Sequence, residues 1–160
     1  MNIPSKEECL AILDNNKTPS NVIKHCKTVC QIAEELVDKL IEKGIEINKD
    51  LVIASALLHD IERDKKNHVE AGASLIKSMG FPEVSEIIRK HTLYNLNNLK
   101  AELKTIEEKI VFYADKRVKG SKIVDLKERF DDLVIRYNND FTNELNFTKK
   151  IEEEINLMLK

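Results

Sequence analysis

The chain has 160 residues, of which 42% are hydrophobic and 34% are charged, and its net charge is −2. That apolar content suits one domain spanning residues 1–160, because two separate halves would each bury too little surface to be stable. The balanced charge argues against an extended nucleic-acid surface or attraction to a membrane, and the longest apolar run is far shorter than the roughly 20 residues that span a bilayer.

Cysteine usage and the N-terminal segment indicate the cellular compartment. Three cysteines without framework spacing favour reduced thiols, and the first residues lack the apolar core of a signal peptide. Cys26 and Cys30, one helical turn apart, could in principle bind zinc. No second cysteine pair completes four ligands, however, and both suit a small apolar role on a buried face. We therefore expect a cytoplasmic protein.

The sparing use of glycine and proline predicts helices throughout the chain and an all-α fold. A Ser-x-x-Glu capping box at 5–8 opens a helix at 5–14, and Thr18 followed by Pro19 opens a helix at 19–43. The next predicted helix, 49–63, contains a nearly unbroken apolar run.

The same signals continue through the second half of the chain. We expect helices at 68–79, 82–91, 105–119, 125–138 and 142–159, with Pro82 in the first turn of its helix and another capping box at 105–108. Residues 95–104 are the expected irregular connection. Residues 121–160 should form a helical cover over a core of about 20–120, docked through an apolar stripe of Phe141, Leu145, Ile151, Ile155 and Met158.

All four histidines are expected to face the interior. His25 and His91 share a helical face with apolar residues three, four and seven positions away. His59 ends the longest apolar run, and His68 opens a helix whose next turn, Ala-Gly-Ala, lets another backbone approach closely. An inward histidine is most often a core residue that makes one hydrogen bond.

Two carboxylates join these histidines: Asp60 follows His59 directly, and Asp115 lies on the apolar face of its helix. A buried carboxylate without a partner costs several kcal/mol. A divalent cation would satisfy all six groups at once, because neutral imidazole and ionised carboxylate ligate the same ions. Spacing alone leaves a metal centre and a set of separate core residues about equally favoured.

The order His25, then His59-Asp60, then Asp115 resembles the HD superfamily of metal-dependent phosphohydrolases, whose signature is similar to "ALLHDI". The segments "NHVEAGASLI" and "IIRKHT" resemble those that supply two further histidines in dinuclear members, including HD-type hydrolases of symmetric diadenosine tetraphosphate. The segment "PSNVIKHCKTVCQIAEEL" resembles the opening of small prokaryotic HD proteins. The resemblance covers roughly residues 20–120 and implies a compact, multi-helix HD-domain bundle.

The resemblance also implies a ligand set for two divalent ions per chain. His25, His59, Asp60 and Asp115 would hold one ion, Asp60 would bridge, and His68 and His91 would hold the second. A single ion held by the first four residues is the alternative. Iron or manganese is favoured because mixed imidazole–carboxylate shells with open octahedral positions suit them, and Mg, Co, Ni or Zn remain alternatives.

The sequence departs from the family pattern after the His-Asp pair. Many members continue with Ile-Gly and a basic residue, whereas here Glu62 replaces the glycine and Arg63 follows. Asp64 falls where the stringent-response hydrolases carry the second acid of a Glu-Asp pair, but Arg63 occupies the place of the first. This departure argues against an alarmone hydrolase.

The expected function is a metal-dependent phosphohydrolase that acts on a nucleotide or another small phosphate ester or anhydride through a metal-activated water. The candidate catalytic residues are Asp60, Arg63 and Asp64, where Asp64 either orients the attacking water or caps a neighbour. Candidates for binding the substrate phosphate are Arg63, Lys66, Lys90 and Arg117, and the alternative for each is a solvated side chain.

Two other functions stay open. One is a non-catalytic HD regulatory protein that binds a metal or nucleotide, and the other is a mixed-valent di-iron oxygenase, since related helical folds with this ligand set oxidise substrates. Tyr94 either packs or stacks on a base. The expected partner is a small phosphorylated substrate, with no membrane, and a homodimer is left open.

Overall fold

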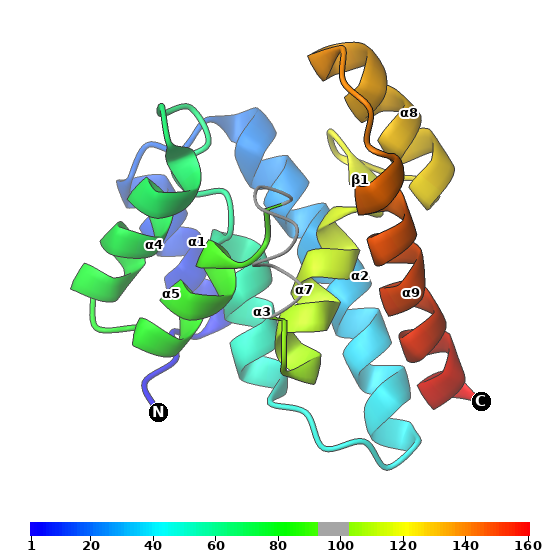
Figure 1. Ribbon diagram of the computed structural model, residues 1–160. Coiled ribbons are helices and arrows are strands. Elements are labelled where there is room, and N and C mark those ends of the chain that lie inside the picture. Colours follow the sequence, from blue (N-terminus) through cyan, green and yellow to red (C-terminus); the bar gives the residue numbers. More distant parts are fainter. Residues whose placement is uncertain (93–102) are drawn as a thin grey trace.

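Figure 1 shows a computed structural model of the chain, in which residues 1–92 and 103–160 are described. The described part is almost entirely helical, which confirms the predicted all-α class. Its only strands, within those ranges, are two residues long. Tyr94 and most of the connection expected at 95–104 lie outside the described residues.

Most of the described helices lie within two residues of their predicted bounds. In chain order they are α1 (Lys6–Asn15), α2 (Ser20–Glu42), α3 (Lys49–Leu58), α4 (His68–Ser78), α5 (Pro82–Arg89), α7 (Ile106–Asp115), α8 (Leu126–Tyr137) and α9 (Thr142–Leu159). The hairpin strands are β1 (Val118–Lys119) and β2 (Lys122–Ile123), which pair antiparallel. In the described segments, none of the helices is long and apolar enough to cross a membrane.

The sequence signals at the helix starts are confirmed with one exception. Capping boxes open α1 at Ser5 and α7 at Thr105, and Pro82 occupies the first turn of α5. The prediction for α2 was wrong by one position, because Pro19 is the N-cap rather than the first helical residue. The Thr18 hydroxyl instead donates to the carbonyl of Ile61 at 3.1 Å, which ties the start of α2 to the turn after α3.

Two helices are shorter than predicted. The third ends at Leu58 rather than at residue 63, and the chain continues in turns in which Ile61 N–H donates to Leu58 and Arg63 N–H to Asp60. The helix predicted at 105–119 ends at Asp115, because a hairpin follows at once and turns at Gly120, whose φ is +63°. Two-residue strands are too short to produce a hydrophobic pattern in the sequence.

The core forms where α2, α3 and α7 pack together, as Figure 1 shows, with α4 and α5 on one side and α9 along α7 on the other. Every residue of the apolar run 51–58 is buried, so α3 has no exposed face over that length. The end of α3 therefore lies inside the molecule. Of the predicted C-terminal stripe, Leu145, Ile151, Ile155 and Met158 pack against α7, while the Phe141 ring contacts Tyr137 instead.

Candidate metal centre

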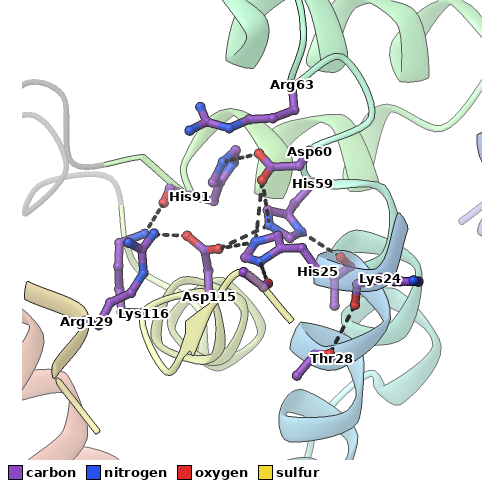
Figure 2. A network of polar contacts seen from close by, with 12 residues as sticks. Lys24, His25, Thr28, His59, Asp60, Arg63, His91, Asp115, Lys116 and Arg129 are labelled. Carbon is purple, nitrogen blue, oxygen red and sulfur yellow. Dashed lines mark hydrogen bonds and ion pairs between the residues drawn. The ribbon is translucent and has the colours of Figure 1, made fainter. Parts of the chain in front are cut away.

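The structure brings all six predicted ligands into one cluster, which comes from five helices or their ends (Figure 2). Each side chain reaches the cluster from a defined place in the fold. His25 lies on α2, His59 and Asp60 follow α3 directly, His68 opens α4, His91 follows α5, and Asp115 ends α7.

The first group of donors is His25, His59, Asp60 and Asp115, whose ligand atoms all lie within 4.8 Å of one another. The Nε2 atoms of His25 and His59 lie 3.0 Å and 3.2 Å from the same oxygen, Oδ1 of Asp115. Both nitrogens also lie 3.5 Å from Oδ2 of Asp60. Two imidazoles and two carboxylates therefore converge on one point.

The second group is Asp60, His68 and His91, and Asp60 belongs to both groups. Its Oδ2 faces the first group, whereas its Oδ1 lies 3.3 Å from Nε2 of His91. One carboxylate thus presents one oxygen to each group. This is the arrangement that a bridging carboxylate needs.

Three of the histidines are oriented by backbone carbonyl groups. The Nδ1 atoms of His25, His59 and His91 lie 2.7 Å, 2.7 Å and 2.6 Å from the carbonyl oxygens of residues 120, 56 and 88. A carbonyl oxygen only accepts, so each Nδ1 carries a proton and each Nε2 points at the carboxylates. Hydrogen bonds from Nδ1 to a carbonyl oxygen fix the tautomer of metal-ligating histidines. The donor set of the described residues therefore fits divalent cations.

The cluster strongly favours added positive charge. Burial lowers the pKa of His59, but Asp60 and other neighbours outweigh it and hold that pKa well above its ordinary value. Burial raises the pKa of Asp115, but Lys116 and the histidines hold it well below its ordinary value. The carboxylates are thus ionised and attract either protons onto the imidazoles or a cation between them.

Lys116 is a buried member of the cluster that the sequence analysis missed. Its Nζ donates to Oδ2 of Asp115 at 2.6 Å and to the carbonyl of His91 at 3.0 Å. It thereby connects the end of α7 to the end of α5. In the sequence, Lys116 belongs to a basic stretch that looks solvated, whereas in the structure it is the buried C-cap residue of α7. Its adjacency to Asp115 was the one available signal.

A cavity of about 730 Å³ opens above the cluster. Its floor includes the predicted ligands except His59, and Arg63 and Lys116 lie beside them. Its opposite wall comes from α8 and the start of α9. That wall includes Arg129, Leu133, Arg136, Tyr137, Asn139, Phe141 and Glu144. The C-terminal segment, expected to be a cover, therefore forms part of the site, and no sequence signal marked those residues.

Of the predicted catalytic and phosphate-binding residues outside the ligand set, Arg63 alone lines the cavity. Its Nη1 lies 3.1 Å from Nε2 of His68, and its Nη2 lies 3.5 Å from the Tyr137 hydroxyl. Asp64 and Lys66 are exposed and lie outside the lining of the cavity.

Two other predicted phosphate-binding residues are engaged elsewhere. Lys90 pairs with Glu108 at 2.8 Å, and Arg117 donates to the carbonyl of Val124 at 2.6 Å and to the Tyr113 hydroxyl at 2.9 Å. The geometry gives their predicted role no support. Cys26 and Cys30 are buried, and the donor groups found among the described residues include neither of them.

Comparison with known proteins places this arrangement in a family. A curated tRNA (cytidine(56)-2′-O)-methyltransferase of Picrophilus torridus is 32% identical over 96% of this chain and 47% of its own length. Uncharacterized protein MJ0778 of Methanocaldococcus jannaschii is 32% identical over 96% of this chain and 98% of its own length. A dihydroneopterin 2′,3′-cyclic phosphate phosphodiesterase of the same organism is 30% identical over 78% of this chain and 56% of its own length.

The chain thus spans about half the length of the named enzymes that it matches. No solved structure matches it significantly. The HD domain family matches residues 22–118, which is more than half of the chain and includes all six clustered side chains. This protein belongs to the HD domain family.

Proposed function

We propose that this protein is a metal-dependent phosphohydrolase that cleaves a small phosphate diester, with a 2′,3′-cyclic phosphate as the favoured substrate. The observation that carries the proposal is the pair of donor groups sharing Asp60 on the floor of the cavity. Phosphoryl transfer needs a site that binds an anion and activates water, and both requirements follow from this arrangement.

The six clustered side chains would hold two divalent cations, with iron or manganese favoured. Such ions lower the pKa of water from 15.7 toward about 7 and neutralise phosphate oxygens. The protein's own part is orientation. The carbonyl-bound histidines aim their Nε2 atoms, and Lys116 fixes the second oxygen of Asp115 so that the first faces His25 and His59.

The charge of the cavity walls supports an anionic substrate. Basic side chains on the lining outnumber the carboxylates there, and they are Lys24, Arg63, Lys116, Arg129 and Arg136. Arg63 is the one that reaches both the second donor group and the opposite wall. We assign it to neutralising the phosphate, because a planar guanidinium can donate to two phosphate oxygens at once.

The relative named as a cyclic phosphate phosphodiesterase supports a diester as substrate. The methyltransferase name is not carried over, because the clustered metal donors and the basic cavity wall suit phosphate hydrolysis. The remaining alternatives, a regulatory HD protein and a di-iron oxygenase, predict other outcomes of one experiment. That experiment screens phosphate monoesters, diesters and anhydrides with protein loaded with manganese, iron, cobalt or magnesium, and it monitors oxygen uptake by the iron form.

The decisive variant is Asp60→Ala, which removes the carboxylate shared by both donor groups. We expect hydrolysis to be abolished while helical circular dichroism is retained, since the apolar core is untouched. Asp131→Ala on the exposed surface of α8 is the matched control and should keep full activity. Activity of reloaded Asp60→Ala within tenfold of the unmodified protein would contradict the proposal, and oxygen uptake without hydrolysis would favour an oxygenase.

A further inference from the structure

The cavity extends beyond the clustered ligands to a pocket formed at the junction of α8 and α9. Leu133 and Tyr137 from α8 and Phe141 and Glu144 from the start of α9 line it. The Tyr137 and Phe141 rings lie 6.3 Å apart at 69°. Asn138, which ends α8 with a φ of +47°, makes the turn that puts both rings on the same wall. Leu133 and the two rings give this outer pocket an apolar and aromatic surface that the floor lacks, beside the polar side chains of Arg129, Arg136 and Asn139.

Among the described residues that line that wall, Glu144 is the one carboxylate. Its Oε2 is buried and, within the described residues, has no hydrogen-bond partner. A buried carboxylate oxygen without a donor loses its hydration and gains nothing in return. An N–H donor from a ligand would satisfy this oxygen.

Nearby basic residues do not supply that donor. Arg136 lines the same cavity, but its Nη2 lies 3.1 Å from Oδ2 of Asp132, one turn earlier on α8. Arg63 is directed toward His68 and the Tyr137 hydroxyl.

The shape and chemistry of the outer pocket select a class of ring. A carboxylate accepts two parallel hydrogen bonds from a ring N–H beside an exocyclic amino group, as on the 2-amino-4-oxo edge of guanine or a pterin. Adenine presents an acceptor nitrogen beside its amino group, and uracil flanks its one N–H with carbonyls, so both would place acceptors against the carboxylate. The aromatic walls favour any planar ring, so the carboxylate and not the walls distinguishes these rings.

We propose that the outer pocket binds the heterocycle of the substrate, and that Glu144 selects a 2-amino-4-oxo ring such as guanine or a pterin. This inference rests on the proposed function, since it places that ring on the same molecule as the phosphate held at the cluster. The Arg63 contact with the Tyr137 hydroxyl joins the two ends of the cavity. Glu144 is thus a specificity residue that touches the substrate away from the reacting phosphate.

The test compares guanosine and inosine 2′,3′-cyclic phosphates, which differ by the 2-amino group alone, with bis(p-nitrophenyl) phosphate as a diester that has no base. We expect the metal-loaded full chain to prefer guanosine over inosine by about 10- to 100-fold in kcat/KM, the range for a hydrogen bond to a charged group. Glu144→Gln should lose this preference, mainly through a higher KM for the guanosine ester. In this variant kcat/KM should fall more for the guanosine ester than for bis(p-nitrophenyl) phosphate, which has no ring for Glu144 to bind.

Glu153→Gln, an exposed position on the same helix, is the matched control and should keep the preference. Equal kcat/KM for the guanosine and inosine esters in the unmodified protein would overturn the proposal, and this outcome does not depend on the folding of any variant. If none of the diesters is hydrolysed, the proposed function fails instead. Calorimetric binding of the two cyclic phosphates then tests the pocket alone, and equal affinities would overturn it.

Discussion

Arg63 occupies the position from which a second cation would approach His68. Its Nη1 donates to Nε2 of His68 at 3.1 Å, and that lone pair cannot serve a guanidinium and a metal ion together. The other donors of the second group, Asp60 and His91, make no such contact with Arg63. Replacing Arg63 with methionine, which keeps an unbranched chain, should therefore tighten binding of the second ion.

The magnitude follows from the contact that is removed. A hydrogen bond from a charged group contributes roughly 1.5–3 kcal/mol when desolvated. Arg63 as a whole is exposed even though its guanidinium lines the cavity, so solvent screening reduces this to about 0.5–1.5 kcal/mol. Because about 1.4 kcal/mol corresponds to a factor of ten, we expect a two- to tenfold gain in affinity. Turnover should fall in the same variant, since the phosphate loses its guanidinium.

Calorimetric titration of manganese into metal-stripped protein measures both sites. Lys66→Met is the control, because it removes the same charge from an exposed position three residues further on, outside the cavity lining. We expect Arg63→Met to bind the second ion more tightly and to turn over substrate more slowly, whereas Lys66→Met should show neither change. A second-site affinity that is unchanged or weaker, relative to Lys66→Met, would refute the competition between Arg63 and the ion.

Two further predictions concern the ions themselves. The double variant His68→Ala with His91→Ala should lower the bound metal from about two ions per chain toward one, as measured by elemental analysis after desalting. If the fully loaded unmodified protein binds only one ion per chain, the dinuclear assignment is rejected. Affinity for the first ion should fall as pH falls, because ligation needs a neutral imidazole. The pKa of His59 is raised, so protons should begin to compete with the metal ion at pH values above about 6.5, the usual pKa of histidine. Titrations that give one affinity between pH 5 and 8 would mean that the histidines are not ligands.

Local signals in the sequence were sufficient for most of the helices, since capping boxes and apolar periodicity act within a few residues. They were insufficient where the outcome depends on distant parts of the chain. The Thr18 hydroxyl donates to the carbonyl of Ile61 instead of capping its own helix, and Lys116 is buried against the end of α5, which is distant in the sequence. The order of the histidines and aspartates indicated the cluster itself.

The contribution of the C-terminal third could not be predicted for a similar reason. Arg129 and Tyr137 lie on a helix whose pattern is that of a surface cover, and nothing within the helix shows that a cavity lies beneath it. A charged residue on the inner face of an amphipathic helix is ambiguous until the facing surface is known. Here that surface is the histidine–aspartate cluster.

The fold explains why the most apolar helix ends in a histidine and an aspartate. Because α3 is buried along its length, its last carbonyl groups cannot bind water and need an internal donor. His59 supplies one, since its Nδ1–H donates to the carbonyl of Ala56, three residues earlier. His91 repeats this at the end of α5 with the carbonyl of Ile88.

At both helix ends the imidazole therefore has two roles. Its Nδ1–H donates to a carbonyl group at the end of the helix, and its Nε2 faces the aspartates of the cluster. Since α7 also ends there, at Asp115, three helix C-termini converge on the cluster. Helix C-termini carry partial negative charge, which adds to the two aspartates. The same features that let α3 and α5 end in the interior thus create a site that requires positive charge, which is the physical reason to expect cations there.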